Sequence, residues 1–446
     1  MLRTHSLLSA GLMAWLVYQP SQAADLLQVY RQAYANDTQI RAAAADLQAS
    51  QETIPQARAL LLPNLNATGQ QNRNFGVSSS PIQRNTEFDS YNYSVGVTQP
   101  LFNQGNFVRQ RLAKSTVEQA DANFAAAEQE LILRTAQRYF DVLTALDTLN
   151  AVIANKNATA QQLEQANRRF EVGLITITDV YEAQARFDLS VANEIVARND
   201  LADRLESLRQ LTNQYHDELS ELDQKAPFKP PTPADPEAWV QLALEHNPRI
   251  HGAAFGTETA RENVNLQKAG HYPSLDLQAN YTDQDSGEIS QSGSQIGLQL
   301  NIPLYLGGAV VSRTREAAYQ YESAKENLEG VQRDTIRQVR DSYRGVLAAI
   351  SRIKALEQAR ISNKSSLEAT QAGFDVGTRT IVDVLDQQRF LYEAERNYSV
   401  ERYIYIISFL SLKQAAGQLK EGDLKAVNDW LIKPKPGQFA MLPKAK

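Results

Sequence analysis

The stretch Phe-Glu-Val-Gly-Leu-Ile-Thr-Ile-Thr-Asp-Val at residues 170–180 returns as Phe-Asp-Val-Gly-Thr-Arg-Thr-Ile-Val-Asp-Val at residues 374–384. The apolar pattern before the first stretch, at 139–149, likewise returns before the second, at 343–353. Agreement at so many positions indicates an internal duplication, in which two similar halves follow one another along the chain.

We expect the first half to span residues 24–212 and the second to span 235–417, each with helices, one β-hairpin and long helices in that order. The Pro-rich segment Lys229–Pro233 lies in the predicted linker at 213–234. Residues 418–446 are expected to add a C-terminal segment with a short helix and a tail rich in Lys and Pro.

Long helices are predicted on both sides of each repeated stretch. Neither Gly nor Pro occurs at 106–172, 174–226 or 378–416, where Ala, Gln, Glu, Leu and Arg, all good helix formers, are abundant. A helix over the first of these runs would be about 100 Å long. Gly173 and Gly377 separate the runs, and glycine suits the left-handed conformation that ends a helix, so each is predicted to mark a helix–turn–helix tip.

The long runs carry a narrow apolar seam. Its residues are Tyr139, Val142, Leu146, Leu149 and Ile153 in the first half, and Ile336, Val339, Tyr343, Val346, Ile350 and Ile353 in the second. Their spacing of alternating threes and fours is typical of helices that pack with a left-handed supercoil.

Each half also contains one predicted β-hairpin, at about 64–101 and about 274–304. Ile296, Leu298 and Leu300 alternate with polar residues, as they do in a strand that has one apolar and one polar face. Polar loops are expected at 74–89 and 283–294. Half-buried strands of a soluble protein would show the same alternation.

Four strands cannot close a membrane barrel, because the smallest such barrels have about eight. An open sheet edge in lipid leaves backbone groups without partners, at a cost of several kcal/mol each. If the hairpins enter a membrane, several copies must therefore share one barrel. A dimer gives too tight a lumen, whereas a trimer gives twelve strands and a ring of six similar halves.

Residues 1–23 have the features of a secretory signal peptide: Arg3, an apolar core at 7–17 and the small-x-small pattern at 21–23. The chain has no Cys, which excludes disulfides, thiol catalysis and a lipid-anchored N-terminal Cys. Its formal charge of −6 argues against nucleic acid as the main partner.

No arrangement of residues indicates catalysis or metal binding. The histidines show no zinc-site spacing, and the pair Gly307-Gly308 lacks the length and the Lys of a phosphate-binding loop. We therefore expect no enzyme, no catalytic residues, no metal and no cofactor.

The chain resembles the TolC family of outer-membrane efflux and secretion ducts over nearly its whole length, in the TolC branch rather than the lipid-anchored drug-efflux branch. Four stretches carry the resemblance: 98–105 (TQPLFNQG), 170–180 (FEVGLITITDV), 300–308 (LNIPLYLGG) and 376–386 (VGTRTIVDVLD). The resemblance implies a mainly α fold with β: a trimeric, twelve-stranded transmembrane β-barrel with four strands per chain, continued by a long α-helical coiled-coil tunnel in the periplasm. Residues 213–234 and 418–446 would lie around the middle of that tunnel.

The resemblance also implies a function and partners. It implies a passive duct from the bacterial outer membrane into the periplasm for type I protein secretion, multidrug efflux or both. The duct would be a homotrimer in outer-membrane lipid, opened by a periplasmic adaptor protein and an inner-membrane ABC or RND-type transporter. The alternative is a soluble periplasmic coiled-coil adaptor or scaffold, which would leave the two amphipathic hairpins without an explanation.

Functional residues follow from the same resemblance. The adaptor would contact the helix tips at Val172, Gly173, Leu174, Thr176, Val376, Gly377, Thr378 and Thr380. Asp383 and Asp386 would line the narrowest part of the tunnel, where six carboxylates favour cations and would bind multivalent cations that block flow.

A gate latch would consist of Arg379 and, on a neighbouring helix, Thr178 and Asp179. At position 374, where the resemblance predicts Tyr, this chain has Phe. Phe374 cannot donate a hydrogen bond to Asp179, so a weaker closed state is expected. Opening would rearrange the helices at about 309–373 and 378–416.

Overall fold

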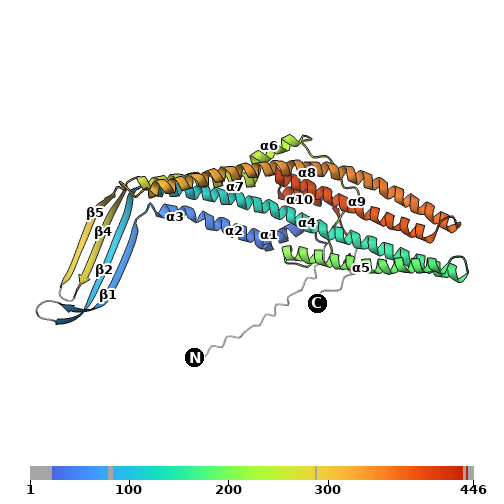
Figure 1. Cartoon of the computed structure of the whole chain (residues 1–446), viewed down its shortest axis with the longest axis horizontal. Coiled ribbons are helices and arrows are strands. Elements are labelled where there is room, and N and C mark those ends of the chain that lie inside the picture. The colour runs from blue at the N-terminus through green and yellow to red at the C-terminus, as the bar shows by residue number, and fades with distance from the viewer. Residues whose placement is uncertain (1–22, 79–83, 287–288, 435–437, 440–446) are drawn as a thin grey trace, which may run out of the picture.

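The computed structural model describes residues 23–78, 84–286, 289–434 and 438–439 of the chain. The predicted signal peptide, apart from Ala23, lies outside these described residues, as does most of the predicted tail after residue 434. Figure 1 shows an elongated molecule, with a β-sheet at one end and the turns of two long helical hairpins at the other.

The two halves have their elements in the same order. The first half consists of α1 (Leu26–Asn36), α2 (Thr38–Gln51), α3 (Thr53–Ala59), β1 (Asn64–Ser78), β2 (Arg84–Asn103), α4 (Gln104–Glu171) and α5 (Ile177–Thr212). The second half consists of α6 (Pro236–His246), α7 (Pro248–Lys268), the short 3-10 helix η1 (Ala269–His271), β4 (Ser274–Asp285), β5 (Ser290–Asn301), α8 (Ala309–Asp375) and α9 (Ile381–Ala415). Three short elements lie outside this repeat: β3 (Glu221–Leu222), α10 (Glu421–Asn428) and β6 (Leu431–Ile432).

The expected long helices are confirmed. α4 has 68 residues and α8 has 67, and each is followed by a helix of about half that length. Asn213 caps the C-terminal end of α5, and its φ of 55° places it in the left-handed conformation. Within the described part of the chain, no helix combines the length and the apolar character that crossing a membrane requires.

The two hairpins join into one antiparallel sheet with the strand order β1-β2-β4-β5. The strands from the two halves pair through β2 and β4, with Val97 opposite Ala279. β1 and β5 are therefore the edges of the sheet in a single chain, and neither edge has a partner strand among the described residues.

Strand register separates apolar from polar side chains. Leu65, Val97, Ala279 and Ile296 lie opposite one another in one row that crosses all four strands. The next row consists of Asn66, Gly96, Asn280 and Gln295. Because opposed residues share a face and neighbours along a strand alternate, one face of the sheet is apolar and the other is polar.

The predicted loops at 74–89 and 283–294 are too long. β1 continues to Ser78, β2 begins at Arg84, β4 continues to Asp285 and β5 begins at Ser290. Strand pairing satisfies backbone groups whatever the side chains are, so polar residues extend both hairpins beyond the region of alternating hydropathy.

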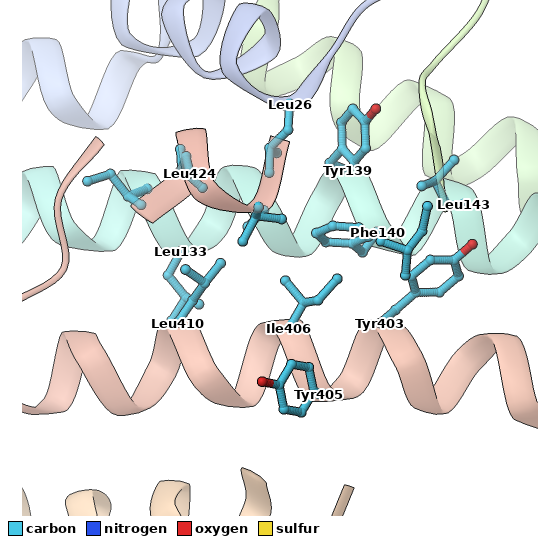
Figure 2. Packing of buried hydrophobic residues seen from close by; sticks show 14 of the residues in the cluster. Leu26, Leu133, Tyr139, Phe140, Leu143, Tyr403, Tyr405, Ile406, Leu410 and Leu424 are labelled. Atoms are coloured by element: carbon cyan, nitrogen blue, oxygen red, sulfur yellow. The ribbon is translucent and has the colours of Figure 1, made fainter. Parts of the chain in front are cut away.

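The main core lies at the middle of the molecule, where α1, α4, α9 and α10 meet. Figure 2 shows Phe140 of α4 against Tyr403 of α9, and their rings stack with centroids 5.4 Å apart. Leu26 and Leu424 close the same cluster and are fully buried. The predicted seam also lies in this cluster, with Tyr139, Val142, Val339 and Val346 fully or almost fully buried.

Candidate functional site at the helical tips

Both helical hairpins turn in the same way at the end of the molecule opposite the sheet (Figure 1). Gly173 has a φ of 74° and Gly377 a φ of 80°, a conformation in which any other residue would be strained. The N–H of Leu174 donates to the Arg169 carbonyl, and the N–H of Thr378 donates to the Gly373 carbonyl, both at 2.8 Å. These bonds satisfy carbonyls that the helix end would otherwise leave without partners.

The turns present apolar side chains to the surroundings. Val172, Leu174 and Val376 have exposed fractions of 70 %, 72 % and 75 %. The residues predicted to contact an adaptor are thus brought together at this end of the chain, on two adjacent hairpins. Exposed apolar side chains in one place are typical of a protein-binding surface.

The helices that follow the turns begin with matching caps. The Thr176 N–H donates to Oδ2 of Asp179 at 2.9 Å, and the Thr380 N–H donates to Oδ2 of Asp383 at 2.9 Å. In return, the N–H groups of Asp179 and Asp383 donate to the two threonine hydroxyls. Thr-x-x-Asp is a recognisable cap signature, but neither copy of it was among the predicted features of the tips.

The cap determines the electrostatics of Asp383. Hydrogen bonds from the N–H and hydroxyl of Thr380, with a smaller contribution from the charge of Arg379, lower the pKa of the Asp383 carboxyl. Asp383 is partly exposed and ionised at neutral pH, and Oδ2 of its carboxylate accepts hydrogen bonds from Thr380 at the start of the same helix.

A small apolar cluster joins the two hairpins just behind the turns. Its buried members are Ala166, Val180, Ala183, Phe374, Ile381, Val384 and Leu385. Phe374 is only 4 % exposed, whereas its counterpart in the repeat, Phe170, is 41 % exposed. The phenylalanine of the duplicated motif is therefore buried in one copy and exposed in the other.

The side chain of Arg169, from α4, packs over the edge of this cluster. Its guanidinium carbon lies 4.2 Å from the centre of the Phe374 ring, and its Nη2 lies 3.3 Å from Oδ1 of Asp375. Arg169 was not among the predicted site residues, because its partners lie about two hundred residues further along the chain.

Arg379 forms no ion pair within the described part of the chain, so it does not contact Asp179 in the single chain. Its stem folds back against the last turn of α8, where a Cβ at Gly373 would lie 2.8 Å from Arg379 Cγ. The Thr176 hydroxyl donates to Oγ1 of Thr178 at 3.1 Å. Among the described residues, no ion pair or hydrogen bond therefore joins Arg379 to Thr178 or Asp179, although all three lie near the tips.

Asp386 is paired across the two hairpins. The Nη1 of Arg186, from α5, donates to Oδ1 of Asp386 at 2.8 Å. Further from the turns, the amide of Gln162 donates to Oε1 of Gln371 at 3.4 Å. Besides the apolar cluster, polar contacts therefore connect the hairpins in this part of the molecule.

Comparison with known proteins gives concordant matches. The family described as "Outer membrane efflux protein" matches residues 29–214 and 239–418. The outer membrane protein TolC of Vibrio cholerae is 41 % identical over 414 residues, which cover 91 % of this chain and 93 % of that protein. The alkaline protease secretion protein AprF of Pseudomonas aeruginosa is 30 % identical, with 94 % and 89 % of the two chains covered. The crystal structure of the outer membrane protein VceC of V. cholerae matches the fold with a TM-score of 0.75 at 20 % identity, covering 88 % of this chain and 96 % of VceC.

Proposed function

Since this chain belongs to the outer membrane efflux protein family and is an outer-membrane duct for secretion or efflux, we propose that three copies form one passive channel. The four-stranded sheets would join into a twelve-stranded barrel in the membrane, and the helical hairpins would form a tunnel through the periplasm. A family of ducts is a family of transport proteins, and we propose that this chain catalyses no reaction.

The observation that carries this proposal is a sheet with one wholly apolar row across four strands and two unpaired edges. Leu65 and Ile296, which lie at the two ends of this row, are 69 % and 75 % exposed in the single chain. Lipid can cover such a face, but lipid cannot satisfy the backbone groups at the edges β1 and β5. Pairing of β5 with β1 of a neighbouring copy would satisfy them and close the ring.

The unequal burial of the two repeated phenylalanines supports the same assembly. Within one chain, the α4–α5 hairpin covers Phe374 of the α8–α9 hairpin. In a ring of six similar hairpins, an equivalent contact recurs between copies, where it would cover Phe170. The exposed Tyr181, Leu189 and Val196 of α5 would then face the same neighbour.

We propose that the helical tips form the closed inner mouth of the duct. The exposed tip residues, among them Val172, Leu174 and Val376, would dock a periplasmic adaptor. Docking would open the duct only if the adaptor binds the open form more tightly than the closed one. An inner-membrane ABC or RND-type transporter would supply both cargo and energy.

The latch and the constriction are part of this proposal. Arg379, which forms no ion pair within the described part of its own chain, would pair with Asp179 or Thr178 of a neighbouring copy. Asp383 and Asp386 of three copies would surround the narrowest part of the tunnel. A carboxylate ring at that place favours cations and disfavours anions.

Cargo follows from the relatives. Similarity to a protein named for alkaline protease secretion supports protein export through type I systems, and the family description supports efflux. The polar row from Asn66 to Gln295 would line the lumen with uncharged groups, which suits cargo of varied charge.

The experiment is to express the full chain, separate the envelope fractions and record currents from the purified protein in planar bilayers. We expect outer-membrane recovery, a mass of three copies in detergent, and a pore current. Arg379→Ser should raise the open fraction. Recovery from the soluble periplasm as a single copy without current would instead favour the periplasmic adaptor or scaffold.

A further inference from the structure

Arg186, like Arg169, is a cation at the contact between the two hairpins near the tips. It belongs to α5, and its Nη1 lies 2.8 Å from Oδ1 of Asp386 on α9. The two side chains are 31 % and 34 % exposed, so the pair is partly shielded from water. Such a directional guanidinium–carboxylate pair largely cancels the charge of Asp386 towards its surroundings.

Asp383 is in a different environment, although it lies three residues away on the same helix. Its hydrogen bonds come from Thr380, through the backbone N–H and the hydroxyl, and both donors are neutral. The charge of Arg379 makes a smaller contribution, and within the described residues it forms no ion pair with Asp383, so Asp383 keeps most of its charge. The two aspartates that would line the constriction are thus unequal in charge.

The other charges near this pair do not replace Arg186. Arg389 lies 3.9 Å from Asp386 but only 3.0 Å from Glu393, one turn further along α9. Glu182 lies 3.8 Å from Arg186, one turn earlier on α5. Asp386 is the nearest acid to Arg186, and Arg186 is the nearest cation to Asp386.

We propose that Arg186 sets the charge selectivity of the constriction by neutralising Asp386, so that Asp383 alone supplies the net negative charge of the ring. This inference rests on the proposed function, because it requires Asp386 to line the tunnel. Arg186 would act as a positioning residue: it holds the Asp386 carboxylate towards α5 and offsets its charge.

The experiment measures the reversal potential of single channels in a KCl gradient. Arg186→Gln should shift it towards the potassium equilibrium potential, because three uncompensated carboxylates then face the pore. Arg186→Lys should have a reversal potential near that of wild type, because it keeps the positive charge. This variant tests whether the charge of residue 186, rather than the geometry of the guanidinium, sets the selectivity. Asp386→Asn should shift the potential the opposite way, because Arg186 is then left without its partner.

The double variant Arg186→Gln/Asp386→Asn removes the pair as a unit and should return selectivity close to wild type. Arg204→Gln is the control, since Arg204 pairs with Asp200 within α5 and both side chains are about half exposed.

The inference is overturned if Arg186→Gln conducts with an unchanged reversal potential while Asp386→Asn shifts it. If Asp386→Asn also changes nothing, the assignment of the constriction fails together with the inference. A wild-type protein without current would refute the duct itself.

Discussion

The guanidinium of Arg169 covers the ring of Phe374 at 4.2 Å and reaches Asp375 at 3.3 Å, so one side chain of α4 contacts two consecutive residues of α8. Phe374 lacks the hydroxyl that the family resemblance leads one to expect. The contact with Arg169 provides another way to hold the last turn of α8 against the α4–α5 hairpin. The closed form therefore need not depend on a hydroxyl at position 374.

Replacing Arg169 by Gln should destabilise the closed form. A cation over an aromatic ring and a partly exposed ion pair together contribute about 1 kcal/mol per copy. That amount corresponds to about a fivefold change in the ratio of open to closed channels if one copy is decisive. The measurement is the open fraction of single channels in a planar bilayer.

Arg168→Gln is the matched control, because Arg168 is 75 % exposed and, among the described residues, its ion pair is with Glu164 of the same helix. It should leave the open fraction near that of wild type. Equal behaviour of the two variants would show that the contact between Arg169 and Phe374 does not hold the duct closed.

The two caps at the tips provide an internal comparison. Thr380→Val should raise amide hydrogen exchange in the first turn of α9 and leave α5 unaffected, whereas Thr176→Val should do the reverse. Loss of an N-cap hydroxyl costs about 1 kcal/mol, so protection in the affected turn should fall about fivefold. Mass spectrometry of peptides covering 177–183 and 381–387 separates the two effects, and a change in both turns from either variant would contradict independent caps.

The cap of α9 also predicts a pH dependence. The hydrogen bonds from Thr380 lower the pKa of Asp383 in the folded chain, so an ionised Asp383 stabilises the fold. This contribution is fully present above the unfolded aspartate value of about 3.9 and is lost as pH falls through the lower folded value. The protection factor of the first turn of α9, which corrects the exchange rate for the intrinsic effect of pH, should therefore fall on acidification. Asp383→Asn should show no such fall, and an identical pH profile of the protection factor would exclude Asp383 as its source.

Much of this architecture could be predicted from the chain itself. The duplicated motif located both turns, because a positive φ at the end of a helix calls for glycine, and Gly173 and Gly377 occupy equivalent positions. Alternating hydropathy located the hairpins through residues such as Ile296. It could not locate their ends, since strand pairing continues through polar residues.

The contacts of the tips could not be predicted in the same way. The heptad seam shows which face of a helix is apolar but not which distant hairpin that face meets. Arg169 and Arg186 each find partners about two hundred residues away, and nothing local marks either arginine. The Thr-x-x-Asp caps are local and could have been read from the sequence at Thr176 and Thr380.

A hydrogen bond inside the main core joins two helices at the middle of the molecule. The Tyr403 hydroxyl donates to Oδ2 of Asp147 at 2.8 Å, which links α9 to α4. Burial raises the pKa of Asp147, while hydrogen bonds from Tyr403 and Ser399 oppose that rise. Because the pKa of Asp147 is higher in the folded chain than in the unfolded chain, ionisation of Asp147 destabilises the fold. The stability therefore falls as pH rises from the unfolded pKa through the folded pKa.

Tyr403→Phe should lower the free energy of unfolding by about 1–3 kcal/mol at neutral pH, since the Asp147 carboxylate loses a donor. It should also raise the pKa of Asp147 further, so the loss becomes smaller as pH falls and Asp147 takes up a proton. Denaturant unfolding across the acidic range measures both effects. Tyr405→Phe is the control, because in the described part of the chain its hydroxyl forms hydrogen bonds with the neutral backbone of Lys229 alone, and the effect of losing them should not depend on pH. Parallel pH profiles for the two variants would remove Asp147 from the explanation.

Neighbouring residues of β5 can test which face of the sheet meets lipid. Ile296 lies in the apolar row with Ala279, and Gln295 lies in the polar row with Asn280. An arginine on a lipid-facing position at mid-membrane costs about 2–4 kcal/mol, so Ile296→Arg should reduce the amount of trimer in the outer membrane. Gln295→Arg places the same charge towards the lumen, where water solvates it, and should assemble normally while shifting ion selectivity towards anions. Normal assembly of Ile296→Arg together with failure of Gln295→Arg would mean that the apolar face does not meet lipid, and the barrel would have to be abandoned.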